Sequence, residues 1–150
     1  MVTMIYFTLE ELIRSKTAER LNIDNKPTPE HRANLEVLVR DVLDPLRALL
    51  GSPITVTSGY RSPLLNRRIG GSETSQHTKG EAADLTCRDN MYLYILAMKH
   101  LEFDQLIYET EDIKDSKGNI IGVKSWVHIS YTKTRKNRKQ SFKMHNHKEI

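Results

Sequence analysis

The sequence predicts an α+β domain in which N-terminal helices pack on a mostly antiparallel sheet. Helical periodicity dominates the first fifty residues, and short β-branched runs follow it. Late in the chain, a polar turn separates two further runs, as in a hairpin. Helices gathered early and strands joined by short connections later are typical of α+β domains. The 150 residues suffice for one hydrophobic core that buries roughly two thirds of the surface of the unfolded chain.

Two short patterns mark helix starts. Thr8 followed three residues later by Glu11 is a capping box, which predicts a short helix from about Leu9. Asp89 can cap a later helix that runs to about Leu101. Both helices would lie close to predicted strands, as an α+β domain requires.

A longer helix is predicted from Thr28 to Gly51. Thr28 can cap this helix, and Pro29 suits its first turn. Pro45 lacks a backbone N–H group, so we expect a kink or a break near it. Apolar residues at helical spacing predict a face that packs against the core: Leu35, Leu38, Val39, Val42, Leu43, Leu46, Leu49 and Leu50.

Short apolar or β-branched runs bounded by turn residues predict the strands. They occupy residues 54–57, 82–86, 104–110 and 120–131, and the last two form a hairpin through a polar turn. Residues 60–80 have little periodicity and several glycines, which predicts a long loop. Long ordered loops in compact domains usually carry a function.

Positive charge is concentrated at the C-terminal end of the chain. The formal net charge is +4, and seven lysines and arginines lie within residues 133–150. We therefore divide the chain into a domain over residues 1–132, which includes the N-terminal helices, and a basic tail over residues 133–150. Such a tail is either solvated or binds polyanions through nonspecific charge. It lacks an aromatic platform or a recognition motif, so no specific nucleic-acid partner is expected.

Cysteine content and hydropathy indicate the cellular setting. Cys87 is the single cysteine, so an internal disulfide is excluded. No run approaches the roughly 18–20 apolar residues of a membrane span, and we expect no membrane insertion. The first residues lack the basic and apolar segments of a secretory signal, which indicates cytoplasmic synthesis. We expect a monomer.

Three residues have the types and placement of metal ligands. Asp84 and His128 lie in predicted strands and could face each other across an antiparallel pair, where opposed Cβ atoms are about 4.5–5.5 Å apart. His77, in the long loop, would complete the set. Three protein ligands with a fourth position open to water are typical of catalytic zinc sites. From the pattern alone, a buried core histidine and a turn-forming aspartate are the alternatives for His128 and Asp84.

Three segments carry a resemblance to a known family. They are SGYRSP at residues 58–63, SQHTKGEAADL at residues 75–85 and WVHIS at residues 126–130. Together they resemble the D-alanyl-D-alanine carboxypeptidase family of zinc peptidases, which includes D,D-dipeptidases and phage endolysins and shares its fold with the hedgehog signalling domain. The resemblance extends from about residue 7 to residue 140.

The resemblance implies a set of site residues. One zinc ion per chain would be bound by His77, Asp84 and His128, with Arg61 and Ser75 near the substrate. Arg61 would stabilise the oxyanion or hold a substrate oxygen, unless it only braces the loop. Ser75 would bind a substrate terminus or tie down the loop, and Tyr60 would line the substrate cleft or pack against the domain.

One position departs from the family pattern. Many relatives carry a Glu or Asp three residues before the last histidine as general base, whereas this chain has Ser125 there. Serine cannot serve as a base at neutral pH. We therefore expect Glu109, at the end of the preceding strand, to take this role, with Glu111 and Asp112 as alternatives.

These expectations combine into one function and one alternative. The function is a zinc metallopeptidase that hydrolyses peptidoglycan stem peptides, either as a carboxypeptidase or as an endopeptidase. The alternative is a zinc-containing module that binds cell wall or protein without hydrolysis, which the serine at position 125 keeps open. A phage or prophage origin would explain how a protein without a secretory signal reaches the wall.

Overall fold

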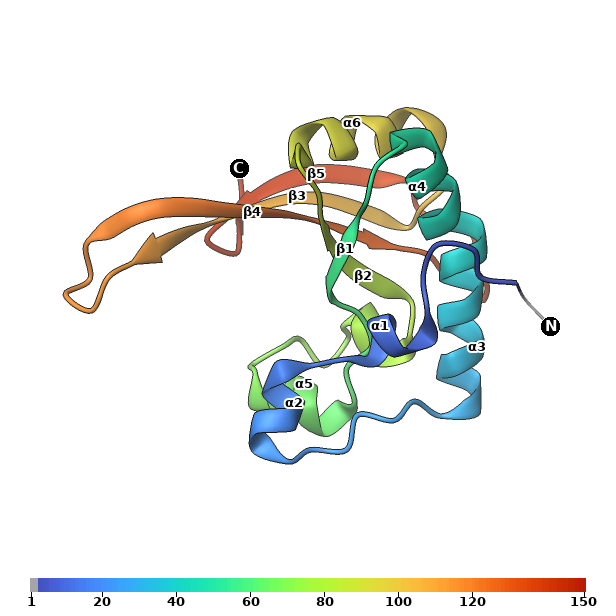
Figure 1. The fold of residues 1–150 in the computed structure, drawn as a ribbon, viewed down its shortest axis with the longest axis horizontal. Coiled ribbons are helices and arrows are strands. Elements are labelled where there is room, and N and C mark those ends of the chain that lie inside the picture. Colours follow the sequence, from blue (N-terminus) through green and yellow to red (C-terminus); the bar gives the residue numbers. More distant parts are fainter. Residues whose placement is uncertain (1–2) are drawn as a thin grey trace.

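The computed structural model describes residues 3–150 and has one mixed, mostly antiparallel sheet of six strands with helices packed on it (Figure 1). The predicted α+β class is confirmed. The strand order is β1-β2-β4-β3-β5-β6. The strands are β1 (Thr55–Ser58), β2 (Ala82–Thr86), β3 (Gln105–Lys114), β4 (Ile120–Ser130), β5 (Gln140–His145) and β6 (Lys148–Glu149).

The N-terminal helices form where the capping residues predict them. The helix α1 (Leu9–Ile13) begins with the complete capping box of Thr8 and Glu11. The longer helix comprises α3 (Pro29–Leu38), a π-helical turn (Val39–Leu43) and α4 (Asp44–Leu50), and it ends at Gly51 with a φ of 74°. The irregularity expected at Pro45 takes the form of this π turn, which ends two residues before the proline and accommodates its missing donor.

Two further helices were not predicted. The helix α2 (Lys16–Leu21) follows α1 directly, with Ser15 as its N-cap. The helix α5 (Pro63–Arg68) occupies part of the stretch that we expected to be loop, and its N-cap is Ser62. Both helices are six residues long, too short for periodicity to reveal them.

The sheet has one face that belongs to the core. Ala83, Leu85, Leu106, Val127 and Ile129 are buried on this face. The helix α6 (Asn90–His100) packs on β3 and β4, as Figure 1 shows, and buried residues of α3 and α4 belong to the same core cluster. Because side chains alternate along a strand, the residues between these apolar positions point to the opposite face. That opposite face carries the polar side chains of the candidate site.

The C-terminal segment joins the sheet. The strand β5 pairs in parallel with β3, and β6 pairs with β5, so residues 140–149 are not a solvated extension. Asp104 holds this segment, because its carboxylate, which is 0% exposed, accepts hydrogen bonds from both Arg135 and Arg138. The positive charge that indicated a tail is therefore partly neutralised by a buried acid.

The hairpin of β3 and β4 projects from the body of the molecule (Figure 1). Its outer part pairs residue by residue from Thr110 with Ser125 to Lys114 with Ile120. None of the helices within residues 3–150 is long and apolar enough to cross a membrane.

Candidate metal centre

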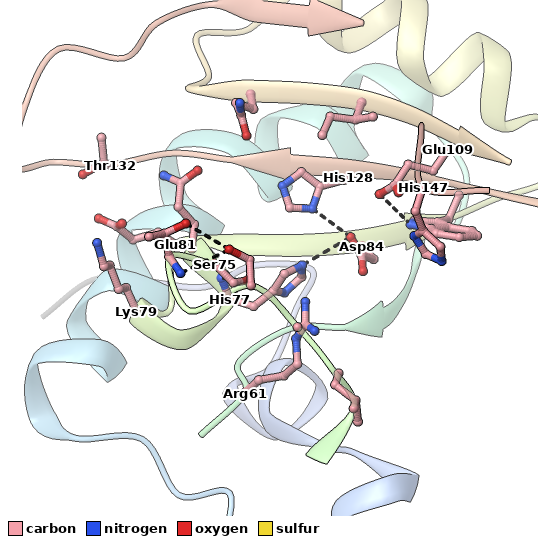
Figure 2. A pocket seen from close by; sticks show the side chains of 18 of the residues that line it. Arg61, Ser75, His77, Lys79, Glu81, Asp84, Glu109, His128, Thr132 and His147 are labelled. Carbon is pink, nitrogen blue, oxygen red and sulfur yellow. Dashed lines mark hydrogen bonds and ion pairs between the residues drawn. The ribbon is translucent and has the colours of Figure 1, made fainter. Parts of the chain in front are cut away.

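The structure brings His77, Asp84 and His128 together on the open face of the sheet (Figure 2). One potential ligand atom from each residue lies within 4.8 Å of the others. The register of β2 and β4 opposes Asp84 to His128, as the alternation of side chains predicted. His77 comes from a short 3-10 helix (Gln76–Lys79), which two residues join to β2.

His77 is held in an orientation that suits a metal ligand. Its Nδ1 lies 2.7 Å from the carbonyl oxygen of Gly59, so Nδ1–H donates and Nε2 stays free. This Nε2 lies 3.4 Å from Oδ1 of Asp84. A side chain at position 59 would collide with the backbone of Leu12, which explains the glycine there. Burial lowers the pKa of His77, and the neutral imidazole is the form that binds metal.

Asp84 connects the two histidines. Its Oδ1 is 3.0 Å from Nδ1 of His128. Burial opposes ionisation of this carboxyl, but attraction to His77 and the hydrogen bond from His128 outweigh it, so the pKa of Asp84 lies far below its usual value. The carboxylate is therefore ionised at neutral pH. Two imidazoles and one carboxylate form a donor set that zinc commonly uses in catalytic sites.

A large cleft opens from this cluster. It has a volume of about 940 Å³, and its lining includes Arg61, Ser75, Glu109 and Trp126 as well as the three potential ligands. Arg61 is attached to the site through its backbone N–H, which donates to the carbonyl oxygen of His77 over 3.0 Å. Figure 2 shows the Arg61 side chain directed toward His77 and Asp84.

Arg61 has an unused donor beside the cluster. Its Nε is buried and has no hydrogen-bond partner within residues 3–150. Burial lowers the pKa of Arg61, with the charges of Asp84 and Glu109 acting against this effect, and a guanidinium stays protonated under such shifts. A buried donor without an acceptor costs free energy unless a ligand satisfies it. The residues present thus fit a metal with an oxygen-bearing ligand beside it.

Glu109 lies in the cleft on the same face as the cluster. Its Oε2 accepts a hydrogen bond of 3.0 Å from Nε1 of Trp126, which fixes the carboxylate. Burial, followed by the nearby charge of Asp84, raises the pKa of Glu109. The other two acids that the sequence left open have different partners. Glu111 contacts His147 and Lys124, and Asp112 bonds Asn146.

Ser75 and Tyr60 have different positions. Ser75 lines the cleft, and its hydroxyl accepts a hydrogen bond of 3.3 Å from the backbone N–H of His77. The Ser75 hydroxyl can therefore both face a substrate in the cleft and tie down the loop. Tyr60 lies outside the cleft, is 3% exposed in the core, and has its hydroxyl 3.2 Å from Nδ1 of His31. This placement agrees with the packing alternative.

Ser125 points away from the site. It lies one strand position from Trp126 and three from His128, so it occupies the opposite face of β4. There it accepts hydrogen bonds from the side chain of Asn90 at its carbonyl and its hydroxyl oxygen. A carboxylate in this position would not reach the cluster without a change in the strand.

The C-terminal segment adds residues that the sequence did not predict for the site. Thr132, Arg135, Arg138 and His147 line the same cleft. Parallel pairing of β5 with β3 brings the segment with His147 to the cleft. Hydrogen bonds to Asp104 hold Arg135 and Arg138 at another part of the cleft. The alternation of residues 140–145 and the acid at position 104 were the available sequence signals.

Comparison with known proteins agrees with the geometry. The family model described as Peptidase M15 matches residues 5–130, which include the three potential ligands, Arg61 and Glu109. No curated protein matches the chain. The matched range covers most of the 150 residues and both strands that carry the cluster. The chain therefore belongs to the M15 family of zinc D-Ala-D-Ala carboxypeptidase-like peptidases.

Proposed function

We propose that this protein is a zinc-dependent hydrolase of peptidoglycan stem peptides. The observation that carries the proposal is the opening of the His77, Asp84 and His128 cluster onto a cleft that also contains Arg61 and Glu109. A closed structural metal site would offer no such space for a substrate. Membership of a family of D-Ala-D-Ala carboxypeptidase-like enzymes supports the substrate class.

The metal would supply one part of the chemistry and the chain the rest. A zinc ion held by the three residues would polarise a peptide carbonyl and lower the pKa of a water molecule. His77 and His128 would contribute imidazole nitrogens, and Asp84 would contribute a negative charge. The hydrogen bond from His77 to the Gly59 carbonyl would hold the imidazole ring in place during hydrolysis.

Glu109 would transfer the proton. Peptide hydrolysis forms a bond between water oxygen and the carbonyl carbon and breaks the C–N bond, and one proton moves from the water to the leaving amine. A carboxylate beside the reacting water can accept this proton and later donate it. Burial and the hydrogen bond from Trp126 hold Glu109 in a fixed position, and its raised pKa makes it a stronger base than a solvated glutamate.

Arg61 and Ser75 would bind the substrate. The Nε of Arg61, which has no acceptor among the described residues, can donate to a carbonyl oxygen, whose negative charge grows as water attacks. The hydroxyl of Ser75 faces the same cleft and can bond a substrate amide or carboxylate. These contacts would align the scissile bond with Glu109.

The test is incubation of the zinc-loaded protein with purified peptidoglycan, followed by mass spectrometry of the released fragments. Loss of single terminal D-alanine residues would indicate a carboxypeptidase, and cut stem peptides or cross-links would indicate an endopeptidase. The Glu109→Gln variant is the matched control, because it keeps the size of the side chain. If the unsubstituted protein binds the wall but releases no fragments, the binding module is favoured instead.

A further inference from the structure

The C-terminal segment places a pair of arginines in the cleft, outside the residues that the family model matches. Arg135 and Arg138 both line the cleft, whereas the match ends at residue 130. Their side chains are 48% and 44% exposed, so each guanidinium is accessible. The family-model match therefore does not cover this part of the cleft.

One buried carboxylate orients both arginines. Nη1 of Arg135 lies 2.7 Å from Oδ1 of Asp104, and Nη2 of Arg138 lies 2.7 Å from its Oδ2. Asp104 is 0% exposed and also accepts the backbone N–H of Arg138. A single carboxylate neutralises only one of the two guanidinium groups. The pair therefore keeps an excess positive charge in a fixed geometry.

Donors remain available on both side chains. Asp104 and the carbonyl oxygen of Lys136 are the acceptors of Arg135 within residues 3–150, and its Nε–H is not among the donors that they use. Arg138 uses Nε and Nη2, which leaves Nη1 without an acceptor in the described part of the chain. A guanidinium with free N–H groups binds a carboxylate more strongly than it binds neutral acceptors.

The surrounding charges preserve this positive character. Lys79 and Glu81 line the same part of the cleft, as Figure 2 shows beside Thr132. The charge of Glu81 acts on Arg135. Together with Lys79, the two arginines still outnumber the carboxylates of Asp104 and Glu81, so this part of the cleft keeps a positive charge. Thr132 and Thr134, which also line the cleft, add neutral hydroxyl groups.

The pair lies at a distance from the metal cluster that suits an extended peptide. Ile107 opposes His128 in the sheet, and Asp104, which holds both arginines, lies three residues before Ile107. At about 3.3 Å per residue, this separation is on the order of 10 Å or more. An extended substrate chain covers that distance with about three residues. Arg61, close to the cluster, is the nearer cation for a group at the scissile bond.

We infer that Arg135 and Arg138 form a subsite for a free carboxylate of the peptide substrate, about three residues from the bond that is cleaved. This inference rests on the proposed function for its substrate class. Stem peptides carry such a group as the α-carboxylate of their γ-linked D-glutamate. The subsite would select substrates in which this group is a carboxylate over those in which it is a carboxamide.

The test measures binding rather than hydrolysis. Synthetic stem pentapeptides ending in D-Ala-D-Ala are titrated by calorimetry into zinc-loaded Glu109→Gln protein, and mass spectrometry verifies that they stay intact. One peptide has the free D-glutamate α-carboxylate, the second has the α-carboxamide, and the third has a C-terminal amide. We expect the first to bind at least about tenfold more tightly than the second, a usual effect of one charge-assisted contact.

Variants assign the preference to the arginines. Arg135→Gln or Arg138→Gln should reduce the preference to less than about threefold, while the other arginine still pairs with Asp104. Lys136→Gln is the matched control, because Lys136 is exposed in the same segment and lies outside the cleft. It should leave the preference unchanged. Thermal melting checks that each variant is folded.

The outcomes separate the subsite from the function. Equal binding of the first two peptides to the parent protein, or a preference that survives both arginine substitutions, would overturn the subsite. If only the peptide with a C-terminal amide binds weakly, and this difference needs the arginines, the pair binds the C-terminal carboxylate and the assignment to D-glutamate is overturned. If an oligonucleotide displaces the peptide, and this displacement needs both arginines, the pair is a general polyanion-binding patch and the carboxylate subsite is overturned. Selective binding without cleavage by the unsubstituted protein would retain the subsite and reject the hydrolase.

Discussion

His128 and Asp84 face each other across β4 and β2, with Nδ1 of the histidine 3.0 Å from Oδ1 of the aspartate. This pair joins the only two strands of the sheet that carry potential ligands, within the described residues 3–150. His77 approaches the same carboxylate from the loop side at 3.4 Å. The metal cluster therefore depends on one strand register and on one short helical turn.

Replacement of His77 or His128 should abolish metal binding. His77→Ala or His128→Ala removes one of three donors, and the remaining two cannot hold zinc tightly. Metal analysis after dialysis should find about one zinc per chain in the parent protein and almost none in either variant. His100→Ala, in the exposed part of α6, is the control and should keep full occupancy. Retention of zinc by either ligand variant would refute this donor set.

Arg61→Ala should slow hydrolysis by about a hundredfold or more while zinc stays bound. The reason is the loss of the buried donor beside the cluster, which has no acceptor in the described residues and is free to stabilise a developing oxyanion. Initial rates on a stem peptide measure the effect. Arg68→Ala, on the exposed side of α5, should react at the parent rate. Unchanged turnover in Arg61→Ala would reduce Arg61 to a brace of the loop.

Glu109→Gln should lower the hydrolytic rate by roughly two to four orders of magnitude. Glutamine keeps the bond from Trp126 but has no basic carboxylate, so zinc content and melting temperature should barely change. Glu111→Gln is the matched control, because Glu111 lies two residues further along β3 and pairs with His147. Glu109 is not the general base if Glu109→Gln keeps full activity, or if Glu111→Gln is the variant that loses it.

Asp104→Asn should destabilise the fold at neutral pH by about 2 kcal/mol, a usual cost of losing charge-assisted bonds at a buried acceptor. Hydrogen bonds from Arg135 and Arg138 outweigh burial and hold the pKa of Asp104 well below its usual value. The pKa is lower in the folded than in the unfolded state, so the carboxylate stabilises the fold above about pH 4. This contribution is lost as the pH falls further toward the depressed pKa.

Urea unfolding of the parent and of Asp104→Asn at several pH values measures this effect. The difference in the free energy of unfolding should be largest above about pH 5 and should shrink in acid. Asp115→Asn is the control, because Asp115 lies in the exposed hairpin turn and is not paired with an arginine in the structure described. A difference between parent and Asp104→Asn that stays constant down to pH 2 would show that charge is not the cause.

Local sequence rules predicted the elements that bear the metal cluster. The alternation of side chains in residues 82–86 and 126–130 correctly placed Asp84 opposite His128. The capping box at Thr8 correctly marked the start of α1. These features depend on neighbours in sequence or on two strands of clear pattern, which is why they were accessible.

Non-local contacts explain what the sequence did not reveal. The strand β5 pairs in parallel with β3 across a long separation, and its basic residues resemble a solvated segment until Asp104 is seen buried against them. Tyr60 is buried in the core and contacts His31, which is 29 residues away. Such pairings need the assembled fold, so periodicity and charge alone did not indicate them.

The most direct test of the account is the hydrolytic rate on a D-Ala-D-Ala stem pentapeptide as zinc is added back to chelator-treated protein. The account predicts no turnover without metal, a rate that rises and saturates near one zinc per chain, and no recovery in His77→Ala. Turnover that persists in metal-free protein, or a zinc-saturated protein that leaves the peptide intact, would contradict it.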